Sequence, residues 1–227
     1  MMAPDYGKTF TLWQAKAADS WRDYTRHPFV EGLRDGSLPR HAFLQYLVQD
    51  YVFLVHFARA WSLGVVKSET LDEMKVCSTT VDALVNHEMA LHIQVCAAEG
   101  IDEQTLFNAA EAPENLAYTR YVLDAGHQGD FLDLMAALAP CVMGYGEIGL
   151  RLAQDRAPDT PYADWINTYA DPGYQSLCKT VGAMIDGAVA RRIGDLATSP
   201  RSAVLQNRFT TATRLEIAFW KMGLNGQ

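Results

Sequence analysis

The sequence has few cysteines, no strand pattern and no excess of positive charge, and each absence excludes a class of protein. Four cysteines occur in 227 residues, and no two have Cys-x-x-Cys spacing, so neither a zinc site nor a redox pair is predicted. Scattered cysteines in a chain of this size predict reduced thiols and a cytoplasmic location. The formal net charge is −8, which argues against a nucleic-acid-binding surface, because such surfaces need clustered Lys and Arg.

Long hydrophobic runs and targeting segments are also missing. The apolar stretches are interrupted before the ~18 residues that a membrane span needs. The first residues lack the basic and apolar regions of a secretory signal. We therefore expect a soluble protein that does not enter a membrane.

The pattern that is present is helical. Apolar residues spaced three and four apart dominate, whereas the alternation and hairpin turns of strands are absent. The predicted helices cover residues 9–26, 40–66, 69–99, 102–109, 113–125, 131–153, 162–169, 174–193 and 200–222. Ser68 is the expected N-cap of the third helix, and Gly100 is expected to end it. No linker or repeat divides the chain, so we predict one all-α domain over residues 1–227, with core helices at 40–66 and 131–153.

The segment APCVMGYGEIGL, residues 139–150, is the first candidate for chemistry. Cys141 and Tyr145 are four residues apart and share a helix face. Glycines destabilise helices, which indicates that another backbone or a ligand comes close here. Pro140 predicts a kink or a helix start, and a helix start would lower the pKa of the thiol. The alternative is a packing helix in which the cysteine is a small hydrophobic residue.

Two carboxylates interrupt apolar helix faces. Asp50 lies between Leu47 and Leu54, so it is either a structural hydrogen-bonding group or a carboxylate that recognises a nitrogen-rich ligand. Glu216 has apolar neighbours on both sides. A buried glutamate has a raised pKa and suits acid/base catalysis, and the alternative is an ion pair with Arg214 or another basic side chain.

Glu88 and His92 are four residues apart and could supply two metal ligands. No second such pair occurs, so we favour a structural Glu–His pair and predict no metal site. The aromatic residues are sufficient to enclose a flat ring, although aromatic residues at helical spacing are more often core.

Several motifs together resemble those of the TenA family, also called thiaminase II. HPFV (27–30), DGSLP (35–39) and YLVQDY (46–51) resemble the N-terminal half of these proteins. APCVMGYGEIG (139–149) resembles the segment that carries the family's cysteine, and WINTYA (165–170) and LEIAFW (215–220) follow in the expected order. The resemblance implies a haem-oxygenase-like all-α fold, assembled as a homotetramer.

The resemblance also implies a function in thiamin salvage without a cofactor. The family hydrolyses 4-amino-5-aminomethyl-2-methylpyrimidine to the hydroxymethyl pyrimidine and ammonia, and it also cleaves thiamin. The matched positions imply that Cys141 is the nucleophile and that Glu216 moves protons to the ring and the incoming water. The implied ligand-binding residues are Asp50 at the aminopyrimidine edge, Phe53 stacked on the ring, and Tyr118, Tyr145 and Tyr169 lining the site, with Tyr121 as an alternative to Tyr118.

Two other functions remain open from the sequence. One is a metal-dependent oxidase or haem-binding relative on the same helical bundle, motivated by Glu88 and His92. The other is a non-catalytic regulatory or binding protein. The presence of Cys141, Asp50 and Glu216 at the matched positions favours the hydrolase.

Overall fold

Helices account for all regular structure in the described part of the chain. The computed structural model describes residues 4–225, without the side chains of His87 and Leu91. The elements are α1 (Lys8–Lys16), α2 (Ala18–Thr25), α3 (Pro28–Asp35), α4 (Arg40–Lys67), α5 (Leu71–Ala83), the π-helix η1 (Leu84–Glu88), α6 (Met89–Ala98), α7 (Glu103–Phe107), α8 (Pro113–Gln128), α9 (Phe131–Asp155), α10 (Ala163–Ala170), α11 (Pro172–Arg192) and α12 (Ser202–Asn225). The predicted all-α class is confirmed.

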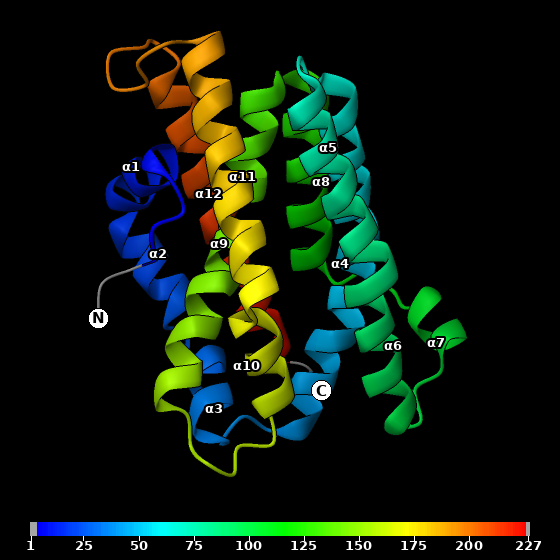
Figure 1. The fold of residues 1–227 in the computed structure, drawn as a ribbon. Coiled ribbons are helices and arrows are strands. Elements are labelled where there is room, and N and C mark those ends of the chain that lie inside the picture. Colours follow the sequence, from blue (N-terminus) through cyan, green and yellow to red (C-terminus); the bar gives the residue numbers. More distant parts are fainter. Residues whose placement is uncertain (1–3, 226–227) are drawn as a thin grey trace.

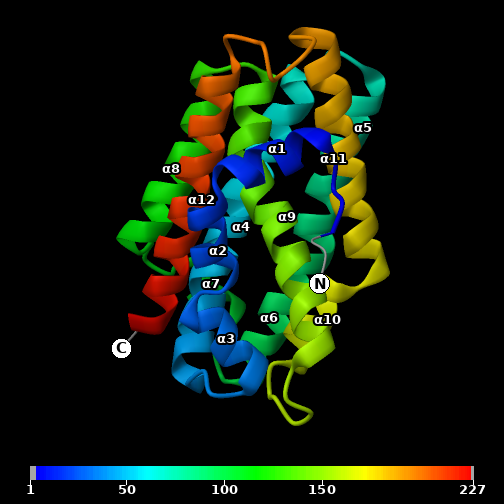
Figure 2. The same ribbon diagram turned by 90° about the vertical axis from the view of Figure 1, so that its left-hand side faces the viewer.

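Helix α9 runs through the middle of the bundle, with α8 and α12 on one side and α10 and α11 on another (Figures 1 and 2). It starts at a capping box, in which the Asp130 carboxylate accepts from the backbone N–H of Asp133 and the Asp133 carboxylate accepts from that of Asp130. Its side chains are buried almost throughout its length. The second predicted core helix, α4, packs against α5, α8 and α12.

Pro140 does not start or end a helix, contrary to one of the two outcomes predicted for it. Helix α9 continues through it from Phe131 to Asp155, because the capping box at Asp130 already supplies the start. Cys141 therefore lies in the middle of a helix, and the predicted lowering of its thiol pKa by a helix N-terminus is wrong.

Two glycines of α9 allow neighbouring elements to approach closely, as the sequence predicts. A Cβ atom on Gly144 would lie 2.2 Å from Cε1 of Tyr24. A Cβ atom on Gly149 would lie 2.5 Å from the carbonyl carbon of Tyr169. The second contact lets the backbone of α10 lie against α9, which sets the position of Tyr169.

The N-terminal predictions need two corrections. The single helix expected at residues 9–26 is divided at Ala17 into α1 and α2. Residues 28–35 form α3, which the sequence analysis did not predict. Pro28 occupies the first turn of α3, where a missing N–H costs nothing, and Gly36 ends the helix in the left-handed conformation with φ 78°.

The helix predicted at residues 69–99 begins later and is not uniform. Its cap is Thr70 rather than Ser68, because Thr70 forms a capping box with Glu73. The Glu73 carboxylate also pairs with Arg191 and Arg192 of α11. Burial would raise the pKa of Glu73, but these arginines and the N–H of Glu69 lower it to about 2.

The π-helix η1 interrupts this long helical segment between α5 and α6. Its i→i+5 hydrogen bonds accommodate more residues per turn than an α-helix does, and such segments are frequent at functional sites. Helix α8 is longer than predicted. It continues through Gly126 to Gln128, although an end near Ala125 was predicted.

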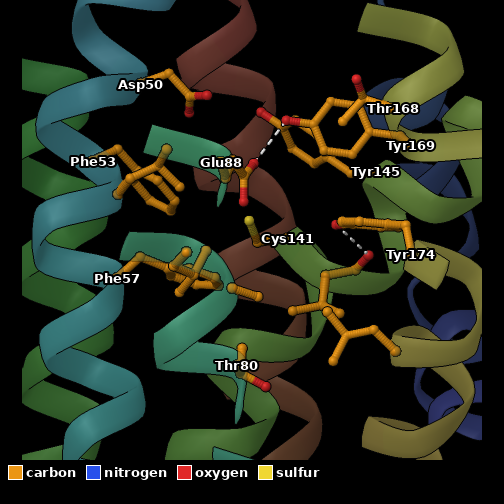
Figure 3. A pocket seen from close by; sticks show the side chains of 15 residues that line it. Asp50, Phe53, Phe57, Thr80, Glu88, Cys141, Tyr145, Thr168, Tyr169 and Tyr174 are labelled. Atoms are coloured by element: carbon orange, nitrogen blue, oxygen red, sulfur yellow. Dashed lines mark hydrogen bonds between the residues drawn. The ribbon is translucent and has the colours of Figure 1, made fainter. Parts of the chain in front are cut away.

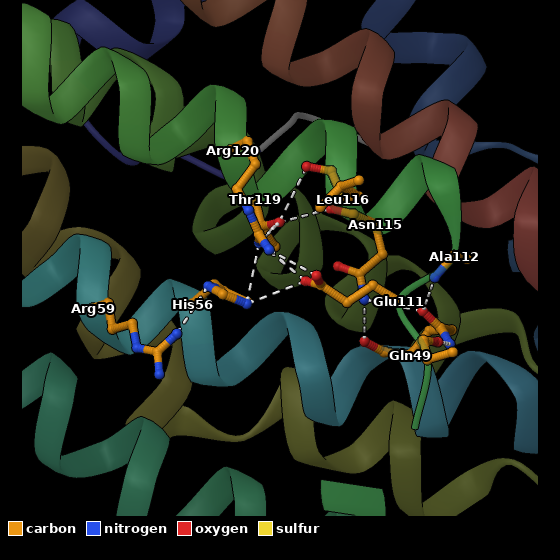
Figure 4. A network of polar contacts seen from close by, with 10 residues as sticks. Gln49, His56, Arg59, Glu111, Ala112, Asn115, Leu116, Thr119 and Arg120 are labelled. Atoms are coloured by element: carbon orange, nitrogen blue, oxygen red, sulfur yellow. Dashed lines mark hydrogen bonds and ion pairs between the residues drawn. The ribbon is translucent and has the colours of Figure 1, made fainter. Parts of the chain in front are cut away.

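A polar network joins α4 to α8 and to the segment before it (Figure 4). The Gln49 amide donates to the carbonyl of Ala110 and accepts from the N–H of Ala112. The Asn115 amide donates to the backbone carbonyl of Gln49 at 2.8 Å. Because Asp50 is the next residue of α4, this network fixes the backbone that carries the Asp50 carboxylate.

Within residues 4–225, one helix meets the length and composition of a membrane span, although no run of this length was expected from the sequence. It is α9, and 89% of its most apolar window is buried inside the bundle. Its hydrophobicity is therefore that of a central helix covered by protein on all sides.

Candidate active site

A cavity of about 200 Å³ lies between α4, the α5–η1 segment, α9, α10 and α11 (Figure 3). This volume is below the ~300–1,000 Å³ of sites for drug-sized ligands, so it suits a molecule of about one ring. The lining combines aromatic residues with a few polar groups: Asp50, Phe53, Leu54, Phe57, Thr80, Ala83, Leu84, Glu88, Cys141, Val142, Tyr145, Thr168, Tyr169, Tyr174 and Leu177. Five of the seven site residues predicted from the sequence are among them.

Cys141 presents its thiol to this cavity from the middle of α9 (Figure 3). Burial raises the pKa of the thiol well above its usual value, and the negative charges of Glu216, Glu88 and Asp50 raise it further. The thiol is therefore neutral at rest. It becomes a nucleophile only if a neighbouring group takes its proton.

Glu216 of α12 is the candidate base that could take the thiol proton. It is a neighbour of the Cys141 thiol, is 1% exposed, and is not among the residues that line the cavity. Burial raises its pKa to about 8, against the opposing effect of the Tyr118 hydroxyl, which donates to Oε1 at 2.8 Å. Arg214 is exposed, and no ion pair joins it to Glu216 among the described residues, so the alternative of an Arg214 pair is wrong.

Tyr118 acts on the site through Glu216 and does not line the cavity. Its ring packs against Phe53, with the ring centroids 5.0 Å apart. The alternative residue, Tyr121, is half-buried, and its hydroxyl donates to the carbonyl of Arg208 at 3.5 Å. Of the two tyrosines, Tyr118 is therefore the one that is bonded to a residue of the candidate site, although it does not line the cavity as predicted.

Asp50 of α4 holds a buried ion pair with His92 of α6. The Asp50 Oδ2 atom lies 2.7 Å from Nε2 of His92 and accepts from the Tyr46 hydroxyl at 3.0 Å. The other imidazole nitrogen lies 2.9 Å from the backbone carbonyl of Glu88. Both partners of the ring accept hydrogen bonds, so the imidazole carries both protons and a positive charge. Burial alone would lower the pKa of His92, but the hydrogen bond and charge of Asp50 raise it.

Glu88 is not the side-chain partner of His92 that the sequence analysis favoured. His92 contacts only the backbone carbonyl of Glu88. The Glu88 carboxylate instead accepts from the Tyr169 hydroxyl at 2.8 Å and points into the cavity (Figure 3). Burial raises its pKa, while the charge of His92 lowers it. Sequence spacing could not show this, because the π-helix changes the direction in which residue 88 faces.

Aromatic side chains form the remaining walls. The Phe53 and Phe57 rings are stacked with centroids 5.1 Å apart on the α4 side. Tyr145 and Tyr169 make an edge-on contact at 4.9 Å on the opposite side (Figure 3). Aromatic faces on two sides of a small cavity suit a flat ring between them.

Metal ligands are not grouped in the described residues: no set of three or more His, Cys, Asp or Glu side chains is arranged to hold a metal ion. Asp50, Glu88 and His92 are instead engaged with one another and with Tyr46 and Tyr169.

These features define a class of protein: an all-α bundle with a small buried cavity in which a cysteine thiol faces carboxylates and aromatic rings. Residues 14–226 match the TENA/THI-4/PQQC family. An aminopyrimidine aminohydrolase from Halalkalibacterium halodurans is 36% identical over 212 residues, which cover 92% of each chain. The chain belongs to the TENA/THI-4/PQQC family, so the resemblance to TenA proteins is confirmed.

Solved structures agree with this assignment. A protein described as a TenA family transcription regulator from Silicibacter sp. TM1040 is 58% identical, with a TM-score of 0.94 over 97% of this chain and 98% of that chain. A domain of unknown function from Shewanella denitrificans, described as having a heme oxygenase-like fold, has a TM-score of 0.68 at 18% identity, over 93% and 92% of the two chains. The predicted haem-oxygenase-like fold is confirmed.

Proposed function

We propose that this chain is an aminopyrimidine aminohydrolase that converts 4-amino-5-aminomethyl-2-methylpyrimidine to its hydroxymethyl counterpart and ammonia, and that it also cleaves thiamin. The observation that carries the proposal is the pairing of the cavity-facing Cys141 thiol with Glu216, whose pKa is about 8. The name of the H. halodurans relative supports hydrolysis of C–N bonds as the reaction class.

Asp50 and the aromatic walls would bind the pyrimidine. The Asp50 carboxylate is paired with His92 through Oδ2, and it can accept a hydrogen bond from the amino group at the edge of the ring. Phe53 and Tyr145 would enclose the faces of the ring, and Tyr169 would close the side opposite α4. The size of the cavity supports a single ring in this position.

Cys141 would act by reversible addition to the ring. The thiol proton passes to the Glu216 carboxylate as sulfur bonds to a ring carbon, and Tyr118 holds that carboxylate in place. The C–N bond of the protonated aminomethyl group then breaks, with its electron pair leaving on nitrogen as ammonia. Water adds to the methylene carbon and loses a proton to the released ammonia, sulfur leaves the ring as thiolate, and Glu216 returns the thiol proton to it. Covalent addition thus divides one difficult displacement into two easier steps.

Ammonia release tests this proposal directly. Wild-type protein should release ammonia from 4-amino-5-aminomethyl-2-methylpyrimidine, and Cys141→Ser and Glu216→Gln should each lower the rate by ~100-fold or more. Cys178→Ser is the matched control, because Cys178 is a buried thiol bonded to the carbonyl of Val142 and lies outside the cavity lining. Equal rates in all four proteins would refute the assigned site, and an inactive wild type would refute the substrate.

A homotetramer in the cytoplasm is the setting we propose for this enzyme, as the family resemblance implies. The description of the Silicibacter structure as a transcription regulator is a competing function. The net charge of −8 disfavours it, since DNA binding needs a basic surface.

A further inference from the structure

Glu88 is a carboxylate that lines the cavity and has no role in the reaction steps proposed above. It is the last residue of η1 and points between Cys141 and Tyr169 (Figure 3). Its charge acts on the thiol, since it raises the pKa of Cys141. Glu88 therefore lines the same cavity as the thiol that would add to the ring.

The hydrogen bonds of Glu88 are incomplete within the described residues. An ionised carboxylate offers about four lone-pair sites. Oε1 accepts from the Tyr169 hydroxyl at 2.8 Å, and Oε2 has no partner among the side chains and backbone groups described. Glu88 is half-buried and lines the cavity, so this oxygen is open to a donor from a ligand.

The other two carboxylates are already engaged. Asp50 is paired with the cationic His92 and accepts from Tyr46, both through Oδ2, and Glu216 is bonded by Tyr118 and is not among the residues that line the cavity. Among the described residues, Glu88 is therefore the carboxylate that lines the cavity without an ion pair to a cationic side chain. An aliphatic amine is protonated near neutral pH, as the ordinary pKa values of Lys and α-amino groups indicate.

On the basis of the proposed function, we infer that Glu88 binds the protonated aminomethyl group of the substrate and so selects a cationic leaving group over the neutral hydroxymethyl product. Tyr169 fixes the carboxylate in this direction. The amine is held in its protonated form, so the C–N bond can break with its electron pair on nitrogen and release neutral ammonia without a further proton. The hydroxymethyl product has no charge for Glu88 to hold, which favours its release.

Glu88→Gln tests this inference through the difference between two ligands. We expect the KM for the aminomethyl pyrimidine to rise by about 30-fold or more, as is usual when one partner of a buried charge pair is removed. The inhibition constant of the hydroxymethyl pyrimidine should change by less than about threefold, because that ligand forms no ion pair. Glu88→Asp, which keeps the charge, should recover part of the discrimination.

Glu147→Gln is the matched control. Glu147 is a carboxylate of α9 whose pKa burial also raises, but it is bonded by Gln14 and Trp21 and lies outside the cavity lining. It should leave both constants unchanged. An equal loss of affinity for both ligands in Glu88→Gln, or an unchanged KM, would overturn the inference while the proposed function stands. A wild-type protein that releases no ammonia would overturn both.

Discussion

Replacing Glu216 by Gln should change how the stability of the protein depends on pH. Glu216 is 1% exposed, and burial raises its pKa from 4.5 to about 8. The folded state therefore favours the protonated acid, and ionisation at higher pH destabilises the fold. This contribution is fully present below pH 4.5, declines as the pH rises from there, and is lost above about pH 8.

The magnitude follows from the size of the pKa change. Each pKa unit corresponds to 1.36 kcal/mol, so the rise from 4.5 to about 8 corresponds to about 5 kcal/mol. Between pH 5 and pH 7.5, the free energy of unfolding of the wild type should fall by about 3 kcal/mol relative to that of Glu216→Gln. Gln cannot titrate, so the variant lacks this decline.

Chemical denaturation of both proteins measures this difference. The free energy of unfolding is determined at several pH values from 5 to 9, at one protein concentration, and the variant is subtracted from the wild type. The subtraction removes groups that titrate in both proteins. A difference that stays within about 1 kcal/mol over this range would refute the argument, because Glu216 would then have an ordinary pKa in the fold.

Three further predictions follow from other contacts. The kcat/KM of the wild type should rise about tenfold per pH unit below pH 8 and level off above it, since Glu216 must be ionised to take the thiol proton; a fall through pH 8 would contradict that role. Glu73→Gln should destabilise the protein by about 3 kcal/mol in denaturation at pH 7, because it leaves the buried Arg192 of α11 with only the exposed Glu69 as an ion-pair partner. The difference should vanish as the pH falls toward 2. Gly144→Ala should lower the free energy of unfolding by about 2 kcal/mol or more, since its Cβ would meet the Tyr24 ring. Gly187→Ala is the control and should be neutral or stabilising, because the atom nearest to its Cβ is the end of a flexible arginine 3.1 Å away. Equal losses of stability in the two variants would contradict the packing argument.

The long helices could be predicted from sequence because their apolar faces are a local property. Helices α4 and α9 were predicted within two residues at each end, and both are central to the bundle. Helix α3 and the break at Ala17 were missed. A short helix that starts at a proline and a one-residue interruption leave little trace in apolar spacing, and tertiary packing decides them.

The residues of the candidate site were also only partly predictable from the sequence. Asp50 was recognisable as a polar residue on an apolar face, but its partner His92 is 42 residues away, and no local pattern joins them. The pair expected between Glu88 and His92 fails because spacing rules assume an unbroken α-helix. A helix start was one of the two outcomes predicted for Pro140, next to Cys141, and the start lies at Asp130 instead. Such contacts depend on how helices meet, which a single sequence does not specify.

The π-helix η1 also constrains how this part of the chain can vary. A loop tolerates an added or lost residue, whereas a one-residue deletion within Leu84–Glu88 would leave too few residues for the wide turn. The segment would then close as an α-helix, and the residues of this turn would face other directions. Glu88 and His92 could not then both keep their partners Tyr169 and Asp50. Homologous sequences with a gap at this position should therefore differ in substrate, even where the cysteine is retained.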